Sequence, residues 1–230
     1  MKTIRQMSLR VCLISLGMVW ALGARAAAEP TVAPALGPTL TRIAGAGVVK
    51  VGYIPTPGTF AFRDGKGETV GYSIDFCLRV IDAVKRTLNR PDLRTEFRPV
   101  QAAQRIPLLK AGEIDIECGG NTNTAARQRD VDFSYTFFNT GVRFLVRKPL
   151  DADNISALGQ KRVAVTKGTT AQEIVERLVN ERGVIPVIVA TDEEGVRMVE
   201  SGQAAAFAQD DILLYGLAAS SGKKDDLAVS

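Results

Sequence analysis

The chain of 230 residues contains no histidine, and this absence excludes several kinds of functional site. Histidine is the usual general base and the commonest metal ligand near neutral pH. The sequence therefore cannot form a Ser-His-Asp triad or a histidine-based zinc site. Cys77 and Cys118, which lie outside the N-terminal leader, would make a poor zinc site by themselves. We expect no metal and no cofactor.

Residues 1–26 have the layout of a secretory signal peptide. Lys2, Arg5 and Arg10 precede an apolar run at 11–22, and Ala24-Arg25-Ala26 follows it. The apolar run is too short to span a bilayer. We therefore expect the leader to be cleaved and the mature protein to be a soluble periplasmic protein.

Loss of the leader also removes the basic excess of the chain. The leader holds four basic residues and no acidic one, so the formal net charge of +4 falls to zero. Without a basic excess there is no electrostatic basis for binding nucleic acid or an anionic membrane. We therefore expect neither as a partner.

Tryptophan and cysteine are also scarce in the mature chain. Trp20 and Cys12 leave with the leader, so the mature protein keeps no tryptophan and only Cys77 and Cys118. An oxidising periplasm permits a disulfide between them, but the sequence does not give the Cα separation that a disulfide requires. The favoured interpretation is that both are small buried hydrophobic residues.

The remaining sequence has the pattern of an α/β protein. Residues 27–40, rich in proline and alanine, predict a flexible lead-in. From residue 41 onward, short apolar runs alternate with amphipathic ones, which is typical of mainly parallel sheets flanked by helices. We predict a first lobe at 41–147 and a second lobe at 148–230, with the break at Lys148-Pro149-Leu150.

Both lobes are predicted as repeated strand and helix units. In the first lobe we expect strands at 48–53, 95–97, 114–118 and 141–147, a helix capped by Ser73, and a helix at 105–111. In the second lobe we expect strands at 162–166, 187–190, 204–208 and 227–230, and helices at 171–182, 193–201 and 212–219. Thr170 and Glu173 have the spacing of a capping box for the helix at 171–182.

The segment Glu117–Ser134 contains the strongest candidate for a binding residue. Glycines end its strand, and Thr124 is placed to cap the next turn, which puts Arg127 in the first turn of a short helix. There the Arg127 side chain lies close to backbone amides and to the hydroxyl of Thr122. A guanidinium beside such donors is suited to a carboxylate.

The second lobe offers further groups for a ligand with two opposite charges. The strand at 162–166 leads through Thr169 and Thr170 into a capped helix, whose N-terminal amides favour an anion. Asp210 and Asp211 follow a strand at its carboxyl end, where a carboxylate can hold an ammonium group. Asp211 is also placed to cap the next helix.

The loop that follows the first strand, at 55–60, is the third candidate region. Ligands of open α/β sheets bind at the carboxyl ends of the strands, and this loop begins at such an end. We therefore include Phe60 among the candidate site residues.

Several short motifs occur in an order that resembles a known family. They are Gly71-Tyr72-Ser73-Ile74-Asp75, Arg105-Ile106-Pro107-Leu108-Leu109, Glu117-Cys118-Gly119, Thr124-x-x-Arg127 with Asp132-Phe133-Ser134, Gly168-Thr169-Thr170, and Glu200-Ser201-Gly202 with Asp210-Asp211. Over about residues 40 to 230 the chain resembles the family 3 periplasmic solute-binding proteins, and among them the glutamate/aspartate-binding subgroup.

The resemblance implies a two-lobed fold of the type II periplasmic-binding class. It also implies a monomeric receptor that closes by a hinge around a polar amino acid, with glutamate or aspartate as the first guess, and then presents it to the membrane permease of an ABC importer. In that family the aspartate that matches Asp210 binds the amine of the ligand, and Asp211 is the alternative.

The residues that would contact the ligand's side chain match the subgroup only in part. Arg105 and Arg143 are retained. The subgroup carries arginine where this chain has Ile54, serine at Ala102 and Gly120, and histidine at Asp192. The loss of one arginine and the gain of Asp192 weaken the case for an acidic ligand, so the identity of the amino acid stays open.

Two alternatives remain. Family members usually continue past the position of Ser230, so we expect either a fragment or an unusually short protein, with an unpaired terminal strand at 227–230. Periplasmic dehydratases of the cyclohexadienyl type are similar to these receptors, and on that alternative Glu117, Asp192 and Asp211 would be the candidates for general acid or base. The binding protein is the favoured interpretation.

Overall fold

The computed structural model describes residues 36–150 and 155–230. Within them the helices are α1 (Pro38–Ala46), α2 (Tyr72–Thr87), α3 (Arg105–Ala111), α4 (Thr170–Arg182), α5 (Asp192–Ser201) and α6 (Asp211–Ser220), with short 3₁₀ helices η1 (Arg127–Arg129), η2 (Ile155–Leu158) and η3 (Lys224–Asp226). The strands are β1 (Val48–Tyr53), β2 (Phe62–Arg63), β3 (Thr69–Val70), β4 (Arg94–Pro99), β5 (Ile116–Glu117), β6 (Val142–Arg147), β7 (Arg162–Thr166), β8 (Ile185–Val189), β9 (Ala206–Asp210) and β10 (Leu227–Val229). The predicted signal peptide and most of the predicted lead-in lie outside the described residues.

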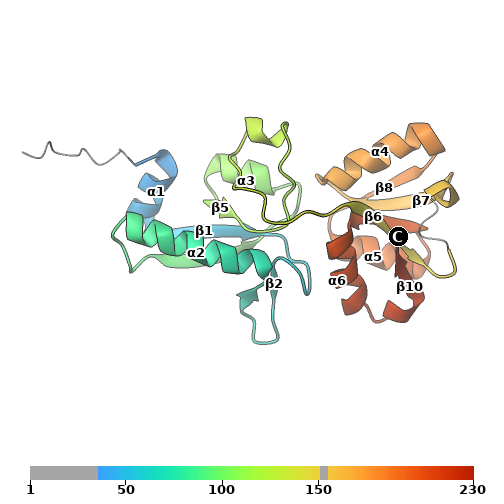
Figure 1. Ribbon diagram of the computed structural model, residues 1–230, viewed down its shortest axis with the longest axis horizontal. Helices are drawn as coiled ribbons and strands as arrows, with labels where there is room; N and C mark the ends of the chain where they lie inside the picture. Colours follow the sequence, from blue (N-terminus) through green and yellow to red (C-terminus); the bar gives the residue numbers. More distant parts are fainter. Residues whose placement is uncertain (1–35, 151–154) are drawn as a thin grey trace, which may run out of the picture. The chain divides into compact units, whose positions relative to one another are not determined.

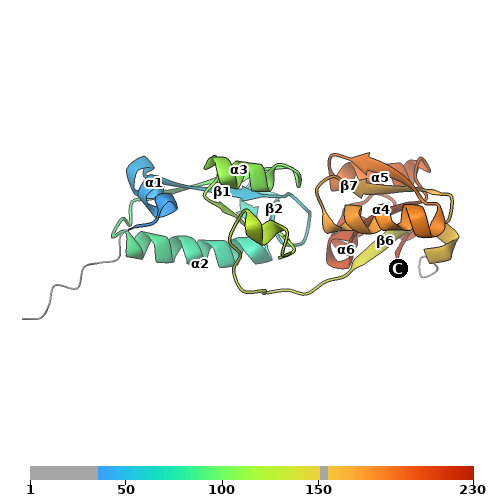
Figure 2. The ribbon, with the colours of Figure 1, turned by 90° about the horizontal axis from the view of Figure 1, so that it is seen from above.

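The first sheet is parallel and has the strand order β4-β1-β5. Its central strand, β1, has the predicted bounds, and Val49, Val51 and Tyr53 are buried in the core beneath α2. Figure 2 shows α2 on one side of this sheet and α3 on the other. We call the part of the chain built on this sheet the first lobe.

The first helix was not predicted. Residues 27–40 were expected to be a flexible lead-in, but α1 begins at Pro38. Proline at the first position of a helix is favourable because its missing N–H would have no partner there. Gly47 ends the helix in the left-handed conformation, with φ 67°.

Helix α2 begins two residues earlier than predicted. Ser73 was expected to cap it, but the residue before the helix is Gly71, with φ 135°. A Cβ at Gly71 would lie 2.4 Å from the carbonyl oxygen of Phe60, so only glycine fits. Ser73 is buried inside the first turn, and its hydroxyl donates to the carbonyl oxygen of Gly119, 3.3 Å away. The prediction of a Ser73 cap was wrong, because the hydroxyl donates to the loop that follows β5 instead of to the start of α2.

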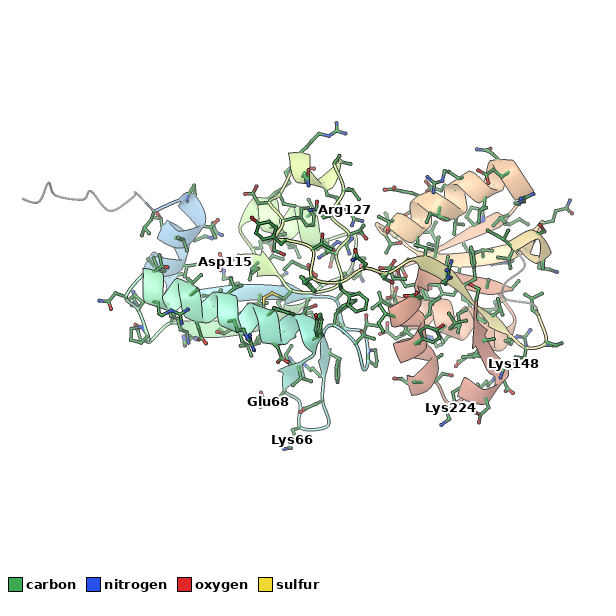
Figure 3. The ribbon with its side chains drawn as sticks, viewed as in Figure 1. Lys66, Glu68, Asp115, Arg127, Lys148 and Lys224 are labelled. Carbon is green, nitrogen blue, oxygen red and sulfur yellow. A yellow bond between two sulfur atoms is a disulfide. The ribbon has the colours of Figure 1, made fainter. Side chains whose placement is uncertain are left out.

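Cys77 and Cys118 form a disulfide, with their Cα atoms 6.2 Å apart. The bond ties α2 to the residue that follows β5, and Figure 3 draws it as the yellow bond beside α2. The favoured prediction of two unpaired thiols was therefore wrong. Sequence alone did not show that the helix and the strand end meet.

The second sheet is mixed and has the strand order β10-β6-β9-β7-β8. Strands β7, β8 and β9 are parallel, whereas β6 runs antiparallel to both of its neighbours. Alternate residues of β7 face opposite cores: Val163 packs with α4, and Ala164 packs with α5 and α6. Figure 1 shows α4 on one side of this sheet and α5 and α6 on the other. We call this part the second lobe.

Two predictions about strand pairing were wrong. The strand at 141–147 was assigned to the first lobe, but β6 pairs with β9, with Leu145 opposite Phe207. The terminal strand was expected to be unpaired, but β10 pairs with β6. The chain therefore enters the second sheet before the predicted break. The prediction missed this because an apolar alternating run indicates a strand but does not identify the strand with which it pairs.

Candidate functional site

A cavity of about 360 Å³ lies between residues of the first and the second lobe. Nine of the ten predicted site residues line it: Phe60, Arg105, Gly120, Thr122, Arg127, Thr169, Thr170, Asp192 and Asp210. Arg143 does not; it is an exposed residue of β6 opposite Gln209. All but one of the predicted site residues therefore line this cavity, whose wall also includes residues that the sequence did not indicate, such as Thr166 and Gln209.

The loop after β5 places Arg127 at this cavity. Thr124 accepts a hydrogen bond from the backbone N–H of Arg127, 3.2 Å away, which confirms the predicted cap. Arg127 begins η1, and its Nη1 donates to the carbonyl oxygen of Thr122 at 2.9 Å. A Cβ at Gly120 would lie 2.7 Å from the ring of Phe60, so glycine is needed where the loop passes that ring. Figure 3 labels Arg127 on this segment.

Two guanidinium groups converge on one carbonyl oxygen of the second lobe. Arg105 Nη2 and Arg127 Nη2 donate to the oxygen of Gly168, at 3.3 and 3.2 Å. Burial lowers the pKa of Arg105 to about 10, and it also lowers the pKa of Arg127. In both residues the negative charge of nearby carboxylates acts against this lowering. Both side chains therefore stay protonated at neutral pH and present positive charge to the cavity.

The turn at Gly168 leads directly into α4. Thr169 is the N-cap, because its Oγ1 accepts from the N–H of Gln172 at 3.2 Å. The prediction that Thr170 caps the helix was wrong by one residue. Thr170 instead lies 3.3 Å from Thr122, hydroxyl to hydroxyl, across the two lobes. The start of α4 and the Arg127 loop thus face the same space, where amides and hydroxyls favour an anion.

Asp210 is the last residue of β9 and is 8% exposed. Burial is the first cause that raises the pKa of its carboxyl; Asp211 and Asp192 add to this, and Arg105 and Arg127 oppose it. Asp211 turns away: its Oδ1 accepts from Thr140 Oγ1 at 2.6 Å, and the residue does not line the cavity. Of the two aspartates, only Asp210 faces the cavity.

Asp192 is the first residue of α5 and is almost wholly buried. Its Oδ1 accepts hydrogen bonds from Thr166 Oγ1 at 2.5 Å and from Gln209 Nε2 at 2.8 Å. Burial raises the pKa of this carboxyl, and the two hydrogen bonds work against that shift. Thr166 and Gln209 were not predicted, since only the pairing of β7 with β9 brings them to Asp192.

Glu117 is the most notable residue that the sequence did not assign to a binding site. Its Oε1 is buried and accepts no hydrogen bond from the described residues. Burial raises its pKa to about 7, while the charges of Arg105 and Arg127 act in the opposite direction. The sequence showed only an acidic residue at a strand end, with Cys118 and then two glycines after it.

The described residues contain no group of three or more cysteine, aspartate or glutamate side chains arranged to hold a metal ion. Among the same residues, no helix has both the length and the apolar character needed to cross a membrane.

Two α/β lobes with a charged cavity between them define a solute-binding protein of the type II periplasmic-binding fold. The chain belongs to the bacterial extracellular solute-binding proteins, family 3, whose sequence pattern matches residues 49–213. The predicted family and fold class are confirmed, with the second sheet mixed rather than mainly parallel.

Individual relatives agree with this assignment. The glutamate/aspartate import solute-binding protein of Escherichia coli (strain K12) is 39% identical over 208 residues, which cover 90% of this chain and 69% of that protein. The L-glutamate/L-aspartate-binding protein of Pseudomonas aeruginosa is 38% identical over 203 residues, or 87% of this chain and 67% of that one. These relatives are binding proteins, so the prediction of a binding protein rather than an enzyme is confirmed.

A solved structure gives the same result. An ancestral arginine-binding protein bound to arginine superposes with a TM-score of 0.70 at 26% identity, covering 80% of this chain and 78% of that one. The chain spans about 70% of the length of the glutamate/aspartate relatives.

Proposed function

We propose that this protein is the periplasmic substrate-binding component of an amino-acid ABC importer. The observation that supports this most is the placement of Arg127 and Asp210 on the same cavity from different lobes. A cation and an anion held apart in one cavity match the two charges of an α-amino acid.

The α-carboxylate of the ligand is assigned to Arg127. The hydroxyls of Thr122 and Thr170 and the N-terminal amides of α4 lie beside it, and these satisfy the remaining lone pairs of a carboxylate. A bidentate guanidinium contact fixes the orientation of the ligand as well as its charge.

The α-ammonium group is assigned to Asp210. This carboxylate lies at the end of β9, and its burial strengthens an ion pair formed with a ligand once water is displaced. With both assignments made, the ligand's side chain is directed at the wall formed by Arg105, Asp192 and Phe60.

The ligand class that the relatives support first is glutamate or aspartate, because the two relatives described above are named for them. The mechanism is closure of the two lobes about their connecting segments, after which the closed form engages the permease. Export by the predicted signal peptide and action as a monomer belong to the same proposal.

A thermal-shift screen of the purified protein against the common amino acids tests this function. A ligand present at a thousand times its dissociation constant stabilises the fold by about 4 kcal/mol, which raises Tm by several degrees. A cooperative transition that no amino acid moves would refute the proposed function.

A further inference from the structure

The cavity holds a second pair of opposite charges, Arg105 and Asp192. They come from different lobes, on α3 and α5, and each side chain is only 5% exposed. Each stabilises the charged form of the other, since Asp192 raises the pKa of Arg105 and Arg105 lowers that of Asp192. The two groups are therefore within electrostatic range of each other.

Despite this attraction, the pair forms no direct contact. Among residues 36–150 and 155–230, the ion pairs with nitrogen and oxygen within 4.0 Å are Arg42 with Asp115, Arg90 with Asp92, Arg98 with Glu113 and Lys110 with Asp130. Arg105 and Asp192 are not among them. A space thus separates a buried donor from a buried acceptor, and both line the cavity.

Each partner keeps hydrogen-bonding capacity for that space. Arg105 uses Nη2 for the oxygen of Gly168, and its Nε and Nη1 donate to none of the described residues. Asp192 uses Oδ1 for Thr166 and Gln209. Its Oδ2 accepts no hydrogen bond within the described part of the chain, and it is not one of the oxygens sealed from solvent there.

We propose that Arg105 and Asp192 form a subsite that selects a carboxamide side chain over the carboxylate of the same length. This rests on the proposed function, because it requires Arg127 and Asp210 to hold the α-carboxylate and the α-ammonium group. Arg105 donates to the amide oxygen, and Asp192 accepts from the amide NH₂. A carboxamide offers one acceptor and one donor group and no net charge, so it satisfies both residues at once.

A carboxylate side chain fits the same wall poorly. It would satisfy Arg105 but would place a negative charge beside Asp192, with Asp210 and Glu193 on the same cavity. Ile54 and Ala102, which also line this region, supply no second cation. Like charges brought together in a buried site disfavour binding, so the acid is discriminated against.

A cationic side chain fits poorly for the opposite reason. Arg105 is held in the wall by Gly168 and remains protonated at neutral pH, so it repels an ammonium or guanidinium group. A cationic group also offers no acceptor to Nε and Nη1 of Arg105, which is costly for a buried donor.

Calorimetric titration of the purified protein at pH 7.5 with glutamine, asparagine, glutamate, aspartate and arginine tests the subsite. We expect the better amide to bind at least about tenfold more tightly than the acid of the same length. In Asp192→Asn the amide should lose affinity and the acid should gain it, which inverts or abolishes the ratio. Asp211→Asn removes the same charge outside the cavity, and the ratio should stay within about twofold of wild type.

A second variant tests the same idea without touching the buried carboxylate. Ile54→Arg adds a cation at the edge of the cavity, and it should move the preference toward the acid even if Asp192→Asn fails to fold. An acid or arginine that binds at least as tightly as the amide, or an unchanged ratio in the folded variants, overturns the subsite and leaves the proposed function standing. Binding of no amino acid overturns both.

Discussion

Nη1 of Arg127 donates to the backbone carbonyl oxygen of Thr122, 2.9 Å away, so the loop before the guanidinium fixes its direction. The same side chain reaches the oxygen of Gly168 through Nη2. One arginine is thus bonded to both lobes. Its plane is already oriented, which lowers the entropic cost of a bidentate contact with a carboxylate.

Removal of this group should abolish binding without unfolding the protein. In Arg127→Ala the ligand's carboxylate loses its charged partner in a partly buried cavity, and we expect a loss of affinity of at least about a hundredfold. The Tm of the unliganded protein should change little, because the side chain is part of no hydrophobic core cluster. Calorimetry measures the affinity, and a thermal melt measures the Tm.

The matched control for that variant is Arg129→Ala. Arg129 lies on the same 3₁₀ helix but is exposed and does not line the cavity. Its removal should leave the affinity within about twofold of the wild-type value, because substitutions at exposed surface positions usually have small effects. Equal losses in both variants would contradict the assignment of Arg127 to the carboxylate.

Substitution of Gly168 by alanine should weaken binding by at least about tenfold, because a 1 Å displacement of binding groups is already costly. Its φ is 81°, and a Cβ there would lie 2.8 Å from the Cα of Ala103 in the other lobe. The methyl group therefore displaces the carbonyl oxygen on which Arg105 and Arg127 converge. Gly58→Ala is the control, since Gly58 also has a positive φ, 69°, but open space around it.

Both glycine variants should lose a similar, modest amount of stability, about 1 kcal/mol, from the backbone strain of a left-handed alanine. Denaturant unfolding measures that cost in each. Only Gly168→Ala should lose affinity as well. A Gly168→Ala protein with wild-type affinity would show that the contact between Gly168 and Ala103 is not required in the bound form.

The disulfide between Cys77 and Cys118 should stabilise the fold. It closes a loop with a sequence separation of 41 residues, for which chain entropy predicts about 4 kcal/mol, the upper end of the typical contribution of about 2–4 kcal/mol. Urea unfolding with and without reductant should show a lower midpoint in the reduced protein, and the double variant Cys77→Ser, Cys118→Ser should match it. Identical midpoints under both conditions would mean that the bond contributes nothing to stability.

Glu117 should make stability depend on pH. Its pKa in the folded protein is raised to about 7 from 4.5, so between these values the folded state binds a proton that the unfolded state has lost. Stability should therefore fall as pH rises from about 4.5 to 7, by roughly 3 kcal/mol at most from this group, and level off above that.

The comparison of variants isolates this group from the other buried carboxyls. Glu117→Gln cannot titrate, so the unfolding free energy measured across that pH range should fall less than in the wild type. Glu181→Gln, at an exposed position of α4, should follow the wild-type curve. A wild-type slope in Glu117→Gln would show that Glu117 ionises at its ordinary pKa.

Local sequence patterns predicted the elements but not all of their partners. The bounds of β1, β7 and α3 were predicted residue by residue, because apolar runs, helical spacing and the glycine or proline residues that flank these elements are local signals. The pairing of β6 with β9 and the disulfide of Cys77 depend on residues far apart in the sequence. No local pattern determines which of two sheets receives a strand.

In the candidate site, too, local patterns predicted some residues, and the others depend on segments far apart in the sequence. Arg127 and Asp210 were found because each follows a strand end with turn residues beside it. Glu117, which the sequence offered only as a catalytic candidate of the dehydratase alternative, does not line the cavity, and its raised pKa comes from a burial that no local pattern shows. Arg143 was included through the resemblance alone, and the strand places it outside the cavity.

On the proposed function, one cavity holds both the carboxylate and the ammonium group of an α-amino acid. Calorimetric titration with the preferred amino acid, with its analogue lacking the amine and with its analogue lacking the α-carboxylate tests this most directly. We expect one amino acid to bind per chain and each analogue to bind at least about a hundredfold more weakly. Binding of either analogue with the affinity of the parent would contradict it.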